Sequence, residues 1–181
     1  MNGWIFIDKP KDITSFKVIQ RLRKILKIKK IGHAGTLDPF ATGILPIAVG
    51  EATKSIHYVN QNKVYVFNIS FGASKDTDDI TGKTIKISNI IPTYEEIDKC
   101  LNKFIGKHTQ VPPQYSAVKI NGKRAYKLAR NKQKFVIQAK DVFIKSLECL
   151  GIKSKSEYSF RMECSTGTYV RSIARDLGKM L

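Results

Sequence analysis

Residues 32–46 constrain the fold more than any other stretch, because they combine glycines, prolines and polar side chains where a core would be apolar. Pro39 fixes its own φ and pushes Asp38 towards an extended conformation, which holds that carboxylate at a defined angle. The apolar residues 44–49 then predict a buried strand, in which Pro46 favours an edge position or a bulge. The stretch therefore predicts an acid beside a buried strand, a layout that suits catalysis.

A structural interpretation fits the same stretch. Asp-Pro is ordinary turn chemistry, His33 can be a structural hydrogen-bonding residue, and Thr36 can cap a local turn. The glycines lack the spacing of a dinucleotide fingerprint, and the stretch lacks the Gly-Lys-Ser/Thr ending of a P-loop. The residues alone leave its chemistry open.

The chain has 181 residues and a formal net charge of +17, from 32 Lys and Arg against 15 Asp and Glu. This length predicts one domain, and the charge predicts a polyanionic partner. Nucleic acid is the leading candidate; an anionic membrane surface is the competitor, although no apolar run approaches the ~20 residues that span a bilayer. Without a secretory signal, we expect a soluble, cytoplasmic protein. The 3 cysteines and 3 histidines are scattered, which predicts neither a disulfide framework nor a metal site.

Apolar periodicity predicts strands at residues 4–7, 63–71, 83–87, 135–150 and 158–164. Strand 63–71 places Tyr65 by default in the core, with both faces at least partly buried. A short helix or turn is expected at residues 51–60. Longer helices are expected after Thr14 or Ser15, after the Thr93 capping box, and after Tyr169.

Two charged regions have open interpretations. The first long helix has an inward face made of Val18, Ile19, Leu22, Ile25 and Leu26. Its basic remainder fits a solvated face and a phosphate-binding surface equally well. The second region contains Asp76, Asp78 and Asp79. These acids lack the full spacing of a calcium site, so we expect an exposed loop there.

Residues 107–130 differ in character from the rest of the chain. Prolines exclude regular structure at residues 111–115, and Asn121-Gly122 predicts a hairpin turn. Tyrosines interleave with a group of cations there, made of Lys119, Lys123, Arg124, Lys127 and Arg130. This pattern suits nucleic-acid contact, although a solvated insertion fits the composition nearly as well.

Several motifs follow one another in a specific order over nearly the whole chain. They are Asp8-Lys9-Pro10 with Thr14-Ser15, Gly32-His33-x-Gly35-Thr36-Leu37-Asp38-Pro39-x-Ala41-Thr42-Gly43, Gly50-x-Ala52-Thr53-Lys54, Lys63-x-Tyr65, Pro112-Pro113-x-Tyr115-Ser116-Ala117-x-Lys119, Gly122-x-x-Ala125-Tyr126 and Gly167-Thr168-Tyr169-x-Arg171-Ser172. In this order they resemble the bacterial tRNA pseudouridine synthase B family, which isomerises the uridine at position 55 in the TΨC arm of tRNA. Ala34 departs from the family, in which Thr is frequent at that position.

The resemblance implies a catalytic site. Asp38 would be the nucleophile, Tyr65 would stack on the flipped uracil, and Arg171 would pair with Asp38. Residues that would contact RNA or wall the base pocket are Lys9, His33, Thr36, Tyr169, Lys119, Lys123 and Arg124. The carboxylate could attack uracil C6, attack ribose C1′, or act through a glycal intermediate.

The resemblance also implies an α+β fold, with a mixed, mostly antiparallel sheet flanked by helices and an inserted RNA-contacting segment at roughly residues 107–133. A single catalytic domain would cover residues 1–181, without the small C-terminal RNA-binding domain of the family. No cofactor or metal is expected, and the partner would be the TΨC stem-loop of tRNA, bound by a monomer with no protein partner evident. The alternative is a noncatalytic RNA-binding or tRNA-chaperone protein with the same fold. A nucleic-acid hydrolase is disfavoured, because the sequence has neither a carboxylate cluster for metals nor a convincing Ser/His or Cys/His nucleophile system.

Overall fold

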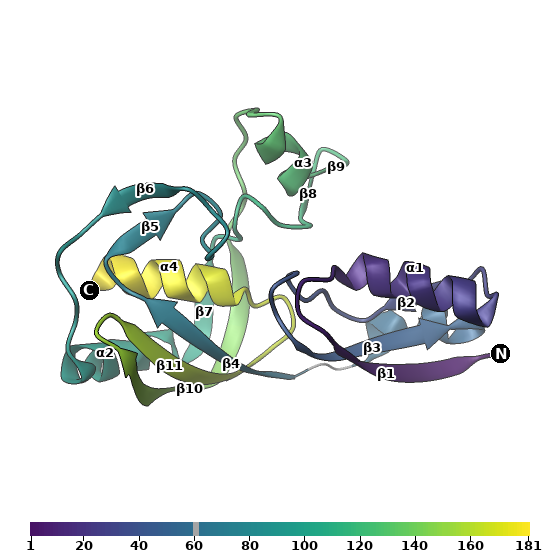
Figure 1. Ribbon diagram of the computed structural model, residues 1–181, viewed down its shortest axis with the longest axis horizontal. Coiled ribbons are helices and arrows are strands. Elements are labelled where there is room, and N and C mark those ends of the chain that lie inside the picture. The colour runs from purple at the N-terminus through teal and green to yellow at the C-terminus, as the bar shows by residue number, and fades with distance from the viewer. Residues whose placement is uncertain (60–61) are drawn as a thin grey trace. The chain divides into compact units, whose positions relative to one another are not determined.

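The computed structural model describes residues 1–59 and 62–181 (Figure 1). The chain divides into two compact units, Met1–Asn60 (unit 1) and Gln61–Leu181 (unit 2). All strand pairings within the described residues are antiparallel, and helices pack on the sheets of both units. The predicted α+β class is therefore confirmed, while a single catalytic domain over the whole chain stays a prediction.

Unit 1 contains a three-stranded sheet in the order β1-β3-β2, formed by β1 (Gly3–Lys9), β3 (Gly43–Val49) and β2 (Ile31–His33). Helix α1 (Ser15–Leu26) packs on one face of this sheet, and Thr14 caps the helix by accepting a hydrogen bond from Lys17 N. Leu45, Ile47 and Val49 alternate into the core that α1 covers.

Two predictions for unit 1 are wrong in detail. Ile25 is 73% exposed, because it lies at the margin of the apolar stripe of α1 rather than at its centre. Pro46 lies in the central strand, with continuous pairing to β1. Its carbonyl accepts a hydrogen bond from Ala34 N at 2.9 Å, just past the end of β2. The position of the missing N–H of Pro46 therefore faces β2, whose pairing with β3 ends at this point, and no hydrogen bond to β1 is lost.

A 3₁₀-helix, η1 (Gly50–Tyr58), follows β3 and packs near Gly32 through Ile56. It corresponds to the short helix or turn predicted at residues 51–60. The last residue of that predicted stretch lies outside the described residues.

Unit 2 contains a four-stranded sheet in the order β4-β11-β10-β7, formed by β4 (Lys63–Ser70), β11 (Glu157–Cys164), β10 (Lys140–Ser154) and β7 (Gly106–Gln110). Helices α2 (Tyr94–Leu101) and α4 (Val170–Met180), with the short η2 (Asn102–Phe104), supply side chains to one core with this sheet. The capping box predicted at Thr93 is present. Val64 and Val66 are 54% and 69% exposed on the opposite face, so the prediction that both faces of β4 are buried is wrong. The helices cover one face only.

Two small hairpins extend from this core. One pairs β5 (Ala73–Lys75) with β6 (Thr84–Ile87), and the other pairs β8 (Lys119–Ile120) with β9 (Lys123–Arg124) ahead of α3 (Ala125–Arg130). Asn121 and Gly122 have φ of 47° and 80°, as the predicted hairpin turn requires. Residues 107–110 belong to β7, so the excursion leaves the sheet only from Val111.

Strand β10 begins at Lys140, later than the predicted residue 135. Within residues 1–59 and 62–181, no helix is long and apolar enough to cross a membrane.

Candidate active site

The loop that carries Asp38 is held through its backbone on both sides of the acid. Ser15 Oγ accepts a hydrogen bond from Leu37 N at 3.0 Å and donates to Leu37 O at 3.2 Å. The Pro39 carbonyl accepts from Asp12 N at 2.8 Å, and Asp38 O accepts from Ala41 N at 3.0 Å. Since the residues flanking Asp38 are fixed, its Cα–Cβ direction is fixed as well, as the Asp-Pro sequence predicts.

Lys9 supplies a further bond to this loop from the interior of unit 1. Its side chain is fully buried, and its ammonium donates to the carbonyl oxygens of Pro10, Ile13 and Pro39 at 2.8, 2.8 and 3.1 Å. Burial lowers the pKa of Lys9, while the charges of Asp12 and Asp38 act in the opposite direction. These bonds favour a role in positioning the loop, and the predicted RNA contact of Lys9 stays a prediction.

His33 and Thr36 precede Asp38 by five and two residues in the same stretch of chain. His33 is half-buried at the end of β2, and its Nδ1 is bonded to the carbonyl of Gly35. Thr36 is exposed in the loop. Gly35 has a φ of 129°, a value that a side chain would disfavour, so the glycine is needed for the turn between these two residues. Unit 1 thus brings Lys9, His33, Thr36 and Asp38 into one local region.

Arg171 lies in the first turn of α4 and is largely buried, with its side chain 11% exposed. Its Nη1 donates to the carbonyl oxygens of Thr77 and Tyr115, both at 3.2 Å, and lies 3.5 Å from Asp79 Oδ2. Within unit 2, the guanidinium therefore contacts two segments distant in sequence. Its predicted pairing with Asp38, which belongs to unit 1, stays a prediction.

The aspartates around Arg171 correct the interpretation of residues 76–79 as an exposed loop. Asp79 is 9% exposed at its side chain, and its Oδ1 accepts from Thr77 Oγ1, Thr81 N and Thr81 Oγ1. Asp78 lies 3.0 Å from Arg175 Nη1. Burial raises the pKa of Asp78, and Arg175 opposes that shift. The loop is half-buried because α4 presents two arginines to it.

Tyr65 and Tyr169 also lie beside α4. Tyr65 is half-buried on the core face of β4, a strand that packs against α4, and Tyr169 precedes the first turn of that helix. Gln110, which is 1% exposed, accepts from Tyr169 N at 3.1 Å and donates to Gly167 O at 3.3 Å. The buried amide of Gln110 thus fixes the turn that leads to Tyr169 and Arg171, a role that the sequence did not indicate.

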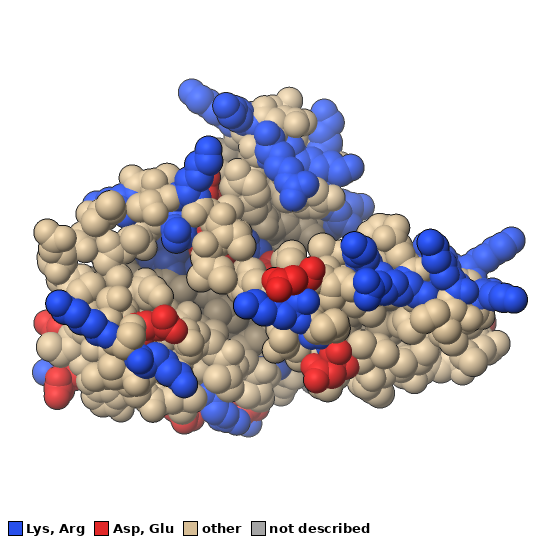
Figure 2. All heavy atoms as spheres, in the orientation of Figure 1, with Lys and Arg blue, Asp and Glu red and all other residues tan. Residues whose placement is uncertain are grey.

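The basic residues gather mainly on two surfaces, along α1 in unit 1 and around residues 119–130 in unit 2 (Figure 2). Lys119, Lys123 and Arg124 are all exposed on the second surface, and Arg124 donates to the Ala117 carbonyl. Arg130 lies over the Tyr126 ring, 5.6 Å from its centroid, which is cation–π distance. The segment that leads to this hairpin includes Tyr115, whose carbonyl contacts Arg171.

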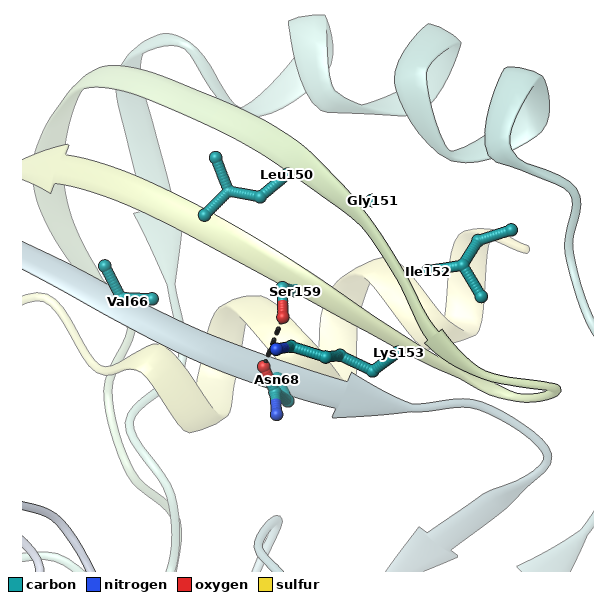
Figure 3. Close-up of a pocket in the computed structure, with 7 residues that line it drawn as sticks. All are labelled: Val66, Asn68, Leu150, Gly151, Ile152, Lys153 and Ser159. Atoms are coloured by element: carbon teal, nitrogen blue, oxygen red, sulfur yellow. Dashed lines mark hydrogen bonds between the residues drawn. The ribbon is translucent and has the colours of Figure 1, made fainter.

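One hollow of unit 2 lies elsewhere, on the outer face of the four-stranded sheet (Figure 3). It measures about 390 Å³ and is lined by Val66, Asn68, Leu150, Gly151, Ile152, Lys153 and Ser159. Ser159 Oγ donates to Asn68 Oδ1 at 2.7 Å inside it. None of the predicted site residues lines this hollow, so it is separate from the candidate site. Over the described parts of the chain, no group of three or more His, Cys, Asp or Glu is placed to hold a metal ion.

A family model described as TruB family pseudouridylate synthase (N terminal domain) matches residues 23–170. The chain belongs to this family. The TruB match spans the Asp38 loop of unit 1 and most of unit 2, up to the residue before Arg171.

Individual TruB relatives agree with the family match. The chain is 51% identical over 180 residues to tRNA pseudouridine synthase B of Ehrlichia ruminantium and 46% identical over 182 residues to that of Brucella ovis. It spans 61% of the first relative's length and 56% of the second's. A chain of the solved Cbf5-Nop10-Gar1 complex is similar, with 28% identity and a TM-score of 0.72, over 99% of this chain and 44% of that one. The predicted family is confirmed.

Proposed function

We propose that this chain carries the catalytic part of a tRNA pseudouridine synthase, which converts the uridine at position 55 of the TΨC arm to pseudouridine. The observation that carries the proposal is the likeness over the whole chain to relatives named tRNA pseudouridine synthase B, at 51% and 46% identity. The geometry of the Asp38 loop supports it, because an acid whose flanking backbone is bonded on both sides is held in place for attack.

The reaction breaks the bond between uracil N1 and ribose C1′ and forms a bond between C5 and C1′. The proton on C5 leaves, and N1 gains one, so the product is an isomer. Asp38 would act as the nucleophile, and Arg171 would keep that carboxylate ionised through its positive charge. Tyr65 would stack on the flipped base, and Tyr169 would help to wall its pocket.

RNA capture would rely on the basic surfaces. Lys119, Lys123 and Arg124 are exposed and able to neutralise phosphates, which is the main source of sequence-independent affinity. His33 and Thr36, beside Asp38, would contact the nucleotides that enter the site. We further propose that the protein acts in the cytoplasm, since the relatives' names specify tRNA. We also propose a monomer, which size-exclusion chromatography with light scattering tests.

The deciding experiment incubates the protein with an unmodified tRNA transcript and maps pseudouridine at nucleotide resolution. We expect one modified nucleotide, at position 55, and none in a transcript with cytidine there. Tight tRNA binding without any pseudouridine would contradict the enzyme and support the noncatalytic RNA-binding alternative.

A further inference from the structure

Helix α4 carries two arginines one turn apart, and each bridges the same two segments of unit 2. Arg171 contacts the Thr77 and Tyr115 carbonyls, and Arg175 contacts the Asp78 carboxylate and the Val111 carbonyl, at 3.0 and 2.9 Å. Residues four apart on a helix lie on the same face. The two side chains therefore form parallel links between α4, residues 77–79 and residues 111–115.

Arg175 makes further hydrogen bonds besides this link. Its Nε and Nη2 also donate to Asp176 at 2.8 and 3.2 Å, which fixes the plane of the guanidinium on its own helix. The side chains of Arg175 and Asp78 are 18% and 17% exposed, so the pair is shielded from most of the solvent. Partly buried, charge-assisted hydrogen bonds of this kind are stronger than exposed ion pairs.

The backbone at Asp78 indicates that this residue is under constraint. Its φ is 57°, in the left-handed region that residues other than glycine seldom adopt, although Asp and Asn tolerate it. Thr77 and Asp79, on either side of it, both contact Arg171. A shift of Asp78 would therefore move both contacts of Arg171 on this loop.

We propose that Arg175 and Asp78 form a positioning pair for the isomerisation, which keeps the Arg171 guanidinium in one orientation. The pair holds residues 77–79 and, together with Ser172 Oγ, which donates to the same oxygen at 2.8 Å, the Val111 carbonyl against α4. It thereby helps to fix the Thr77, Asp79 and Tyr115 acceptors of Arg171. The expected effect on rate rests on the proposed function, because only that proposal gives Arg171 a catalytic role. Arg175 and Asp78 themselves do not touch the reacting atoms in this assignment.

Substitutions that change the charges of the pair in known ways distinguish a positioning role from a role in RNA binding. Asp78→Asn removes a negative charge, so it cannot weaken phosphate binding through electrostatics, and Asn tolerates the same φ. Arg175→Lys keeps the positive charge but loses the planar fork that reaches several acceptors at once. The matched control is Glu163→Gln. It breaks an ion pair of similar length, 2.9 Å between Lys145 Nζ and Glu163 Oε1, on the outer face of the four-stranded sheet of unit 2.

The experiment measures the single-turnover rate at saturating tRNA transcript, the tRNA dissociation constant, and the Nε–H NMR signal of Arg171. We expect Asp78→Asn and Arg175→Lys each to lower the rate by about tenfold. The double variant should lose little more, because both substitutions disrupt the same Asp78–Arg175 interaction. RNA affinity should not fall. The Arg171 signal should broaden or shift in both variants, and Glu163→Gln should match the wild type in every measurement.

Wild-type rates and an unchanged Arg171 signal in both variants would overturn the positioning pair. A rate loss in which the Arg171 signal stays as in the wild type would also overturn it, since the effect would then not pass through Arg171. If Asp78→Asn fails to fold, Arg175→Lys alone decides. If the wild type forms no pseudouridine at all, the proposed function fails, and the Arg171 signal still decides whether the pair positions that guanidinium.

Discussion

In unit 1 the loop around Asp38 is held by hydrogen bonds to backbone groups, from the buried ammonium of Lys9 and the hydroxyl of Ser15. In unit 2 Arg171 and Arg175 are held by carboxylates as well as carbonyls. The loop of the acid is thus held through its backbone, and the arginine through its own side chain. Changing the Asp38 side chain should therefore leave these backbone bonds in place, whereas changes around Arg171 should alter its orientation.

The sharpest test of that difference is Asp38→Asn. The bonds of Leu37 and Pro39 do not involve the carboxylate, so the loop should keep its shape while the nucleophilic charge is lost. We expect the single-turnover rate to fall by on the order of 10⁴-fold, with the unfolding transition and tRNA affinity retained. Asp98→Asn, an exposed carboxylate on α2, is the control. Substantial turnover by pure Asp38→Asn protein would rule out the nucleophile.

The next largest effect should come from the interior of unit 1. Lys9→Met keeps the length of the side chain but leaves carbonyl oxygens without their donor, so the free energy of unfolding should fall by about 3 kcal/mol. Trp4, the single tryptophan of the chain, lies on the same strand and reports the urea transition of unit 1. Lys11→Met, at an exposed position nearby, should change little. Equal stability of both variants would mean that Lys9 does not support the loop.

The two basic surfaces allow a third comparison between the units. Replacing Lys119, Lys123 and Arg124 together by Gln should reduce the log–log salt slope of tRNA affinity by about 2, at roughly 0.7 to 0.9 per lost phosphate contact. The matched triple on α1, at Lys17, Arg21 and Lys24, should have the smaller effect on the slope, because tyrosines interleave with the cations of the hairpin segment in a pattern that suits nucleic-acid contact. Both segments are bonded to the candidate site, α1 through Ser15 and the hairpin segment through Tyr115. An equal or larger effect of the α1 triple would assign phosphate binding to the helix face.

The sequence predicted local features of this fold well. The Thr93 capping box and the Asn121-Gly122 turn each depend on residues within four positions of one another. Such features depend on short-range geometry, which a sequence displays directly. The order of motifs then predicted the family, which is confirmed, while the roles of the site residues stay predictions.

The supports of the site could not be predicted in the same way. Asp78 and Arg175 are 97 positions apart, and an aspartate-rich stretch between strands is usually solvated. The resemblance implied an RNA contact for Lys9, and its burial could not be foreseen, because lysines are seldom buried without partners and its partners here are carbonyls that no sequence pattern marks. Pro46 was assigned to an edge position or a bulge because its N–H is missing, while its actual place depends on where β2 ends.

The smallest expected effect is a pH dependence of the stability of unit 2. His108 lies on β7 of unit 2, its ring centroid is 5.0 Å from that of Phe104, and its Nε2 is buried without a hydrogen-bond partner among the described residues. Burial lowers the pKa of His108 below 6.5, and Asp176 only partly opposes this. As the pH falls through 6.5, the unfolded chain takes up a proton that the folded chain still refuses, so the free energy of unfolding decreases. We expect the protection factors of the β7 and β10 amides, which correct the exchange rates for the intrinsic effect of pH, to fall between about pH 7.5 and pH 5.5, and His108→Gln to lose much of that dependence. Protection factors that fall equally in His108→Gln would show that another group controls the acid sensitivity of unit 2.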